Sequence, residues 1–424
     1  MFDGNRGVQH PAPGYTWCIQ IQVTRSRYEG KMADVAKLNG NHGFSTLAIH
    51  AGEGPDPTTN AHNTPIYQTS TYAFESLEVK QAAADSNGYF YTRNSNPTTS
   101  ALETKIAALE GAEAALAGAS GMAVISATLL TLLHQGDHIV YSSEVYHYSL
   151  EFFEHRAEHY GIDATPVDIT DLEAVQSAIR PETKAIYCEF LSNPRIQVAD
   201  IPELVKIARD RRILLIVDNT FTSPYLFRPI EHGVDLSIHS ATKYLCGHGD
   251  AIAGTVAGSR EMIERIHDTL VVLGSCISPF NSWLILRGIR TLELRMERHC
   301  ANALALAEFI ERQPEVSKVN YAGLTGHPGH EIARDLMGGR FGGMLSFSVP
   351  DTDYSNQLAN ALQLADHGVS LGDVFTLVWP NREDPLVRVS VGCENPEDLI
   401  ADFEQAFETV SSMSDRRLPA TLRK

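Results

Sequence analysis

A lysine and an aspartate each follow a short apolar run, and together they suggest a chemistry. Asp218 comes directly after residues 213–217, and Lys243 follows residues 236–239 at a distance of four positions. Such runs are typical of buried strands. A lysine at this place can form a Schiff base, and an aspartate can keep a pyridinium nitrogen protonated. These are the two groups that an enzyme dependent on pyridoxal 5′-phosphate (PLP) requires of its protein.

Alternating helical and strand patterns surround these two residues from about residue 100 onward. The alternation predicts an α/β architecture, in which a large, mostly parallel sheet is covered by helices on both faces. In such sheets a ligand binds beyond the carboxyl ends of the strands, which is where Asp218 and Lys243 fall. The predicted strands are residues 138–141, 185–190, 213–217, 236–239 and 252–256, and the predicted helices are residues 101–109, 148–160, 171–179 and 202–211.

A smaller α+β domain is predicted for the C-terminal part of the chain. Residues 283–313 have helical apolar spacing with few breakers, so we expect one long helix to lead into it. Strand patterns at residues 343–349 and 386–391 then alternate with helical patterns at residues 354–365 and 396–409.

A turn at Ser120-Gly121-Met122 precedes a predicted helix and indicates a phosphate site. The N–H groups at the start of a helix and its dipole favour an anion there. Ser240 and Thr242 add hydroxyl groups. Taken alone, Gly121 would be a packing glycine and Lys243 an exposed lysine, and it is the joint pattern that favours the cofactor site.

With these motifs in place, the sequence resembles the γ-class PLP enzymes of cysteine and methionine metabolism, the trans-sulfuration family. The most specific segments are Val217-Asp218-Asn219-Thr220, Ser240-Ala241-Thr242-Lys243-Tyr244 and Gly247-His248-Gly249-Asp250. The resemblance extends from about Thr46 to the C-terminal helix. It implies the PLP-dependent transferase fold of type I, and PLP as the cofactor.

The resemblance also implies roles for individual residues. Lys243 resembles the Schiff-base lysine and Asp218 the partner of the pyridine nitrogen. Tyr146 is similar to the tyrosine that stacks on the cofactor ring and serves as acid or base. The phosphate site would comprise Gly121, Met122, Ser240, Thr242, Tyr91 and Arg93, and the substrate and the cofactor 3′-oxygen would meet Asn193, Ser370 and Arg388.

Tyr91 and Arg93 resemble a segment that reaches the cofactor of a neighbouring subunit. The resemblance therefore implies subunit-shared sites and a homotetramer made of two dimers. It divides the chain into residues 1–95 as an N-terminal extension and arm, 96–285 as the PLP-binding α/β domain and 286–424 as the C-terminal α+β domain.

The implied activity is elimination of a heteroatom leaving group from Cγ of an L-amino acid. The alternative is γ-replacement, as in cystathionine γ-synthase or O-acylhomoserine sulfhydrylase. A protein that keeps the fold without catalysis is disfavoured because Lys243, Asp218, Tyr146 and Arg388 are all present.

Three features distinguish the expected pocket within this family. Val369, where cystathionine-handling members carry glutamate, and Asp373 resemble methionine γ-lyases, whereas Tyr148 stands where those lyases have cysteine. The loop at residues 373–384 is short. Its Glu383 and Asp384 could attract a cation such as the side chain of canavanine, although a solvated turn is the favoured interpretation.

A competing motif, His155-Arg156-Ala157-Glu158-His159, matches H-x-x-E-H. On a helix this spacing can place two histidines on one face for zinc, with the glutamate as the base of a peptidase. A motif of five residues arises easily by chance, and no third ligand is indicated. A zinc peptidase is therefore a remote alternative, and we expect no metal.

Composition excludes other classes of partner. The formal net charge of −18 disfavours nucleic acid and anionic lipid, and no apolar stretch is long enough to span a membrane. The six cysteines are scattered without a C-x-x-C pair, which favours a reducing cytoplasm. Residues 1–31 are expected to be an extension, with Met32 as the natural start.

Overall fold

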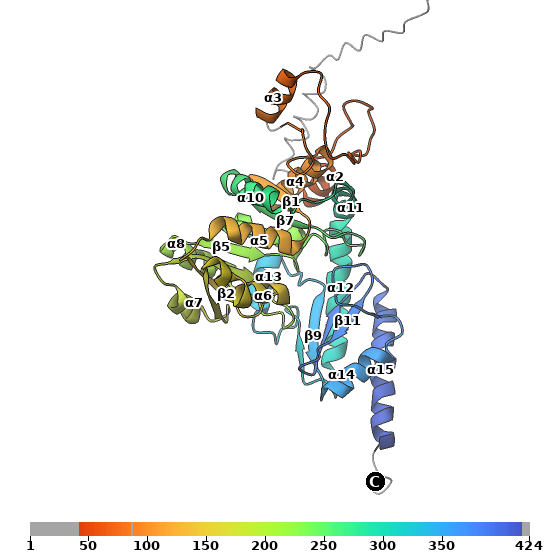
Figure 1. The fold of residues 1–424 in the computed structure, drawn as a ribbon. Helices are drawn as coiled ribbons and strands as arrows, with labels where there is room; N and C mark the ends of the chain where they lie inside the picture. Colours follow the sequence, from red (N-terminus) through yellow and green to blue (C-terminus); the bar gives the residue numbers. More distant parts are fainter. Residues whose placement is uncertain (1–41, 86–87, 418–424) are drawn as a thin grey trace, which may run out of the picture.

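The computed structural model describes residues 42–85 and 88–417, which form a large α/β domain and a smaller C-terminal domain (Figure 1). The expected extension at residues 1–31 and the expected start at Met32 lie outside the described residues. Among the described residues, no helix is long and apolar enough to cross a membrane.

The larger sheet has seven strands in the order β1-β7-β6-β5-β4-β2-β3. All neighbouring pairs from β6 to β3 are parallel, and only β7 runs antiparallel to its two neighbours. The mostly parallel sheet expected from the sequence is therefore confirmed. The strands are β1 (Ala114–Gly118), β2 (His138–Ser142), β3 (Asp163–Val167), β4 (Thr183–Glu189), β5 (Leu214–Asp218), β6 (Leu236–His239) and β7 (Gly254–Gly258).

Helices cover both faces of this sheet, because the side chains of each strand alternate between them. In β5, Leu215 and Val217 pack in the core with α4, α7 and α8, whereas Ile216 packs in the opposite core with α5, α6 and α10. The helices of this domain are α4 (Pro97–Glu110), α5 (Gly121–Leu132), α6 (His147–His155), α7 (Leu172–Ala178), α8 (Ile201–Arg211), α9 (Ser223–Leu226) and α10 (Arg260–Leu273), with 3₁₀ turns η1 (Ala157–Tyr160) and η2 (Pro229–His232).

The smaller sheet has the order β10-β11-β12-β9-β8 and is accompanied by α12 (Leu292–Glu311), α14 and α15 (Figure 1). Its elements are β8 (Lys318–Asn320), β9 (Met344–Ser348), β10 (Asp366–His367), β11 (Leu377–Pro380), β12 (Leu386–Ser390), α13 (His330–Met337), α14 (Thr352–Ala361) and α15 (Pro396–Arg417).

The single helix expected at residues 283–313 is two helices, α11 (Pro279–Ile289) and α12 (Leu292–Glu311). In a continuous helix the carbonyl of Gly288 would accept from the N–H of Leu292. Here it accepts from the backbone N–H and the hydroxyl of Thr291, each at 3.2 Å, and from the guanidinium of Arg295 at 2.9 Å. These competing donors end α11.

The N-terminal described segment carries α2 (Phe44–His50) and α3 (Leu77–Asp85), and the part around α3 projects away from the two sheets (Figure 1). Its base is anchored by Glu53, which pairs with the fully buried Lys105 of α4 at 2.7 Å and with Arg290. Two pairs on one buried carboxylate hold this end of the segment, while the remainder extends beyond the domain.

Candidate active site

The candidate site lies at the carboxyl ends of β4 and β5, where two acidic side chains stand side by side. Glu189 ends β4, Asp218 ends β5, and the two residues are paired in the sheet register. Both are buried. Asp218 and Glu189 therefore sit at the edge where open α/β sheets bind ligands.

Asp218 is held in place by the residue two positions further along. Its Oδ1 accepts hydrogen bonds from the N–H of Thr220 at 3.0 Å and from its hydroxyl at 2.5 Å. Burial raises the pKa of Asp218 above its ordinary value, whereas these hydrogen bonds and the nearby His239 act to lower it. A cationic ring nitrogen beside Asp218 would favour the ionised carboxylate.

The start of α5 forms a cradle suited to an anion. Ser120 caps the helix by accepting a hydrogen bond from the N–H of Ala123 at 3.1 Å, and Gly121 and Met122 occupy the first turn. N–H groups of a first turn have no partner within the helix. A Cβ on Gly121 would lie 3.0 Å from the Cβ of Ser240, so glycine lets the helix approach the Ser240 loop closely.

The two hydroxyl groups expected at this cradle differ in their present partners. Ser240 lies against Gly121. The hydroxyl of Thr242 instead donates to the carbonyl of Ala253 at 3.1 Å and accepts from its N–H at 3.0 Å. Binding of a phosphate by Thr242 would require its hydroxyl to turn away from Ala253.

Lys243 is positioned by a contact between the two domains. Its Nζ donates to the hydroxyl of Ser370 at 2.8 Å. Burial lowers the pKa of Lys243 to about 8, and the positive charge of Arg388 acts in the same direction. The amine is thus far closer to its neutral, nucleophilic form at neutral pH than an exposed lysine would be.

Arg388, in the middle of the buried strand β12, brings the C-terminal domain to the site. One guanidinium nitrogen donates to the side-chain oxygen of Asn193 at 3.3 Å. The other donates to the carbonyls of Val369 at 3.0 Å and Ser370 at 3.3 Å. Burial lowers the pKa of Arg388, and no carboxylate of the described residues forms an ion pair with it. A buried guanidinium without an anionic partner is suited to receive a substrate carboxylate.

Tyr146 stands at the start of α6, where its backbone N–H donates to Oε1 of Glu189 at 2.6 Å. Its side chain is 41% exposed and meets Tyr148 edge to face, with ring centroids 5.7 Å apart. Burial and Tyr148 raise the pKa of Tyr146, whereas Arg388 acts to lower it. An exposed ring beside Arg388 is available for stacking on a ligand.

Glu189 is a site residue that the sequence reasoning did not single out. Burial and the neighbouring Asp218 raise the pKa of Glu189 well above its usual range, while hydrogen bonds from the backbone of Tyr146 and Asn193 act to lower it. The available signal was an acidic residue inside the apolar run 185–190, a position where a charge is costly unless it has partners.

Tyr91 and Arg93 are not brought to this cluster within the chain. They follow the projecting segment around α3 (Figure 1), where the guanidinium of Arg93 lies over the ring of Tyr91 at 5.3 Å and Tyr91 bridges to Thr71.

The zinc interpretation fails on geometry. The helix expected at residues 148–160 ends at His155, and His159 lies in the separate 3₁₀ turn η1. Both histidine side chains are exposed. The described residues contain no group of three side chains able to hold a metal ion.

The residues expected to set specificity lie on an exposed rim. Val369 is 69% exposed and Tyr148 is 56% exposed. Asp373 is directed toward Gly249, where an added Cβ would meet its Oδ2 at 2.2 Å. Asp384 is not simply solvated, as expected for a turn, because it pairs with Arg195 at 2.6 Å.

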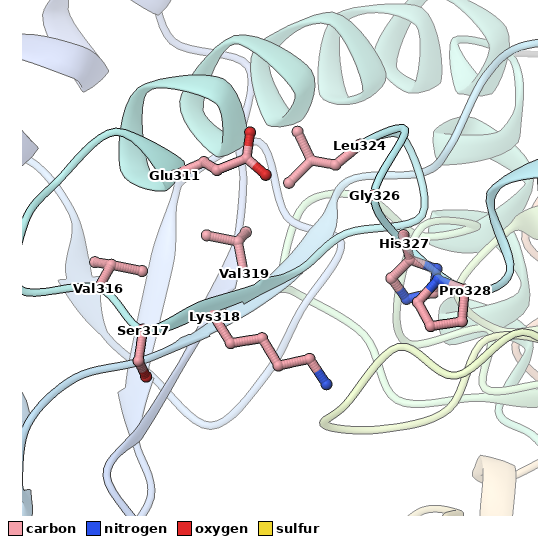
Figure 2. A pocket seen from close by; sticks show the side chains of 9 residues that line it. All are labelled: Glu311, Val316, Ser317, Lys318, Val319, Leu324, Gly326, His327 and Pro328. Carbon is pink, nitrogen blue, oxygen red and sulfur yellow. The ribbon is translucent and has the colours of Figure 1, made fainter.

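A separate surface pocket of about 250 Å³ lies between the end of α12, β8 and the loop at residues 324–328 (Figure 2). None of the candidate site residues lines it. The pocket is therefore distinct from the place where the chemistry of Lys243 and Asp218 would occur.

These elements fit PLP and define the class of the protein. The α5 cradle suits the phosphate, Asp218 the ring nitrogen and Lys243 the aldehyde carbon. The fold and the site are those of a PLP-dependent enzyme of fold type I. The chain belongs to the Cys/Met metabolism PLP-dependent enzyme family, whose model matches residues 45–408.

Known proteins similar to the chain agree with this assignment. It is 42% identical over 388 residues to the L-methionine gamma-lyase of Pseudomonas putida, covering 86% of this chain and 97% of that protein. It is 40% identical over 383 residues to the canavanine gamma-lyase of Pseudomonas canavaninivorans, covering 86% and 96%. A solved structure of a putative O-acetylhomoserine (thiol)-lyase from Campylobacter jejuni, with N'-pyridoxyl-lysine-5'-monophosphate, has 32% identity and a TM-score of 0.83, covering 87% of this chain and 100% of that one.

Proposed function

We propose that the protein is a PLP-dependent γ-lyase that eliminates a heteroatom leaving group from Cγ of an L-amino acid. The observation that carries the proposal is the contact of Lys243 with Ser370 at 2.8 Å, directly beside the guanidinium of Arg388. In this arrangement an amine of lowered pKa lies next to a guanidinium that would bind the α-carboxylate. The names of the similar proteins, methionine and canavanine gamma-lyase, support elimination rather than another reaction.

In this proposal, Arg388 and Asn193 bind the substrate carboxylate. Asn193 already accepts from the guanidinium, so it orients Arg388 before substrate arrives. The carbonyls of Val369 and Ser370 fix the other nitrogen. A planar guanidinium held in this way binds a carboxylate through two hydrogen bonds at little cost in side-chain entropy.

Proton transfer would fall to Lys243 and Tyr146. PLP, when bound through its phosphate at Gly121, Met122, Ser240 and Thr242, supplies an electron sink for the substrate's Cα–H bond. The displaced amine of Lys243 would then take the Cα proton, since burial favours its neutral form. Tyr146 would serve as acid or base for the leaving group on Cγ.

The substrate experiment separates elimination from replacement. Purified PLP-loaded protein would be assayed with methionine, homocysteine, cystathionine, O-acetylhomoserine and canavanine, with and without added thiol. Keto acid released without thiol would support the γ-lyase. Products that appear only with thiol would overturn it in favour of a γ-replacement enzyme.

The leaving group is proposed to be neutral, as in methionine. The acidic loop offers limited attraction for a cation, because Asp384 is paired with Arg195 while Glu383 alone is exposed. Efficient turnover of canavanine, measured in the same screen, would contradict this preference.

We further propose a homotetramer of two dimers in which Tyr91 and Arg93 complete the phosphate site of the neighbouring subunit. Support comes from the family and from the part of the chain around α3, which precedes Tyr91 and Arg93 and projects away from the two sheets (Figure 1). Hybrids of Lys243→Ala and Arg93→Ala subunits should regain activity that each parent lacks. Hybrids without activity would contradict shared sites, and light scattering would measure the mass of the assembly.

A cytoplasmic location is proposed from the thiols. The cysteines of the described residues, Cys188, Cys246, Cys276, Cys300 and Cys393, are all free. Free and largely buried thiols are typical of proteins from reducing compartments. Fractionation of the native cells, with activity followed in each fraction, would test the location.

A further inference from the structure

One arginine outside the expected site joins the three segments that carry Tyr146, Asn193 and Arg388. The guanidinium of Arg195 donates to Glu144 at 3.3 Å and to Asp384 at 2.6 Å. Glu144 is two residues before Tyr146, Arg195 is two residues after Asn193, and Asp384 is four residues before Arg388. A single side chain therefore links β4, the start of α6 and the loop before β12.

The Arg195 bridge also crosses from the large domain to the C-terminal domain. Glu144 and Arg195 follow strands of the larger sheet, whereas Asp384 precedes β12 of the smaller one. Arg388 lies on that strand and meets Asn193 of the large domain at 3.3 Å. The bridge and the Arg388–Asn193 contact are thus two neighbouring connections between the same pair of segments.

The environment makes this bridge more than an ordinary surface pair. The side chains of Glu144 and Asp384 are 24% and 31% exposed, and that of Arg195 is 45% exposed. Burial raises the pKa of Glu144, as do Asp168 and Asp384, while Arg195 acts to lower it. Without Arg195, the carboxylates of Glu144 and Asp384 would repel each other across the domain boundary. The guanidinium is suited to this place because its fork can serve two carboxylates at once.

We propose that Arg195 is a positioning residue that fixes the Asp384 loop against the Tyr146 and Asn193 segments, and so sets the Arg388–Asn193 site for the substrate carboxylate. The inference rests on the proposed function, because the ligand is the amino-acid substrate of that reaction. Arg195 acts through Arg388 and Asn193, and its partners among the described residues, Glu144 and Asp384, lie outside the cofactor cradle at α5.

The test compares Arg195→Gln with the unaltered PLP-loaded enzyme. Partly exposed ion pairs are individually weak, so the loss of the pairs of Arg195 with Glu144 and with Asp384 should raise KM about three- to tenfold. We expect kcat to stay within about twofold and PLP affinity to be unchanged. Arg195→Lys should give an intermediate KM, since an ammonium lacks the fork that reaches both carboxylates.

Variants of Asp384 test whether Arg195 affects KM through its ion pair with that residue. Asp384→Asn should raise KM in the same direction, and the double variant with Arg195→Gln should add little beyond the single ones, because both remove the same connection. Arg156→Gln is the matched control. Arg156 pairs with Glu151 at 2.8 Å on the surface and lies at the opposite end of α6 from Tyr146, so the KM of Arg156→Gln should equal that of the unaltered enzyme.

A second readout is independent of turnover. Binding of L-norvaline, which has no leaving group on Cγ, would be followed through the visible absorption of bound PLP, and Arg195→Gln should weaken it by the same three- to tenfold factor. Equal norvaline affinity and equal KM in wild type and Arg195→Gln would overturn the inference. A loaded enzyme that binds norvaline but turns over no amino acid would instead contradict the proposed function.

Discussion

The buried edge of the large sheet and the exposed rim formed with the C-terminal domain divide the candidate site into two regions. Asp218 is 7% exposed, whereas Val369 and Tyr148 are 69% and 56% exposed. At the edge, Asp218 and the start of α5 are held by hydrogen bonds from residues close to them in the chain. At the rim, the side chains of Val369 and Tyr148 are exposed, and the ion pair of Arg195 with Asp384 connects the neighbouring segments.

The two regions differ in their expected roles, with the chemistry at the buried edge and the choice of substrate at the exposed rim. Groups that hold the cofactor need fixed positions and low dielectric surroundings, both of which the edge of a buried parallel sheet provides. Groups that select among leaving groups occupy loops, which change without disturbing the core. Substitutions at the edge should therefore have large effects on every substrate, and substitutions at the rim should have small effects that differ between substrates.

The largest expected effect is that of Lys243→Ala. Loss of the amine removes both the proposed attachment point of the cofactor and the proposed base, so turnover should fall by about 10³-fold or more. The visible absorption of bound PLP should be lost as well, as measured by spectroscopy of the purified protein. Lys206→Ala, on an exposed lysine, is the control. Retention of activity in Lys243→Ala would contradict the assignment of the chemistry to the buried edge.

Arg388 lies where the two regions meet, and Arg388→Gln should act mainly on KM. Hydrogen bonds to a charged group contribute about 1.5–3 kcal/mol, so KM should rise by roughly 10- to 150-fold while PLP stays bound. Steady-state kinetics and an absorption titration measure the two quantities. A loss of PLP binding without a change in KM would place Arg388 with the cofactor rather than with the substrate.

The pH dependence of the rate at which PLP binds tests the buried edge alone. The pKa of Lys243 is lowered from an ordinary 10.5 to about 8, so the folded PLP-free protein binds fewer protons than the unfolded chain between these values. Its stability should therefore rise with pH across that window, since the unfolded state holds the extra proton. The rate of PLP capture, followed by absorbance, should reach half its maximum near pH 8.

Arg388→Gln is the control for this pH profile. Because the charge of Arg388 helps to lower the pKa of Lys243, its removal should move the midpoint of PLP capture to higher pH. A midpoint that stays in place would show that burial alone sets the pKa of the amine.

The smallest expected effect is that of Val369→Glu on the rim. A carboxylate there could pair with the distal ammonium of cystathionine, and an exposed pair of this kind is worth at most about 1 kcal/mol. The ratio of kcat/KM for cystathionine to that for methionine should rise about two- to fivefold. Val369→Gln, without the charge, should leave the ratio unchanged. An equal gain in both variants would exclude an electrostatic origin.

Much of the fold and of the buried edge could be predicted from sequence. The apolar runs before Asp218 and Lys243 are nearly coincident with β5 and β6, and the mostly parallel sheet with a smaller C-terminal domain is confirmed. The family, PLP as its cofactor and an enzyme of the lyase type are confirmed as well. Local periodicity carries this information because a strand buried on both faces requires a continuous apolar run.

Local patterns failed where individual side chains compete with regular structure or interrupt an apolar run. The break between α11 and α12 depends on Thr291 and Arg295, whose donors reach the carbonyl of Gly288. The strand β3 was missed because Asp163, Thr165 and Pro166 interrupt its apolar character. The H-x-x-E-H motif was expected on one helix, but α6 ends at His155 and His159 lies in the 3₁₀ turn η1.

The amino-acid sequence alone indicates the type of chemistry, because the proposed Schiff-base lysine, pyridinium partner and phosphate cradle each lie in a short segment beside a strand or helix end. Which of these groups meet depends on the tertiary structure. Lys243 and Ser370 are 127 positions apart, Arg388 and Asn193 are 195 apart, and Arg195 and Asp384 are 189 apart. Contacts over such separations arise from the packing of two domains, and the local periodicity of the sequence does not predict them.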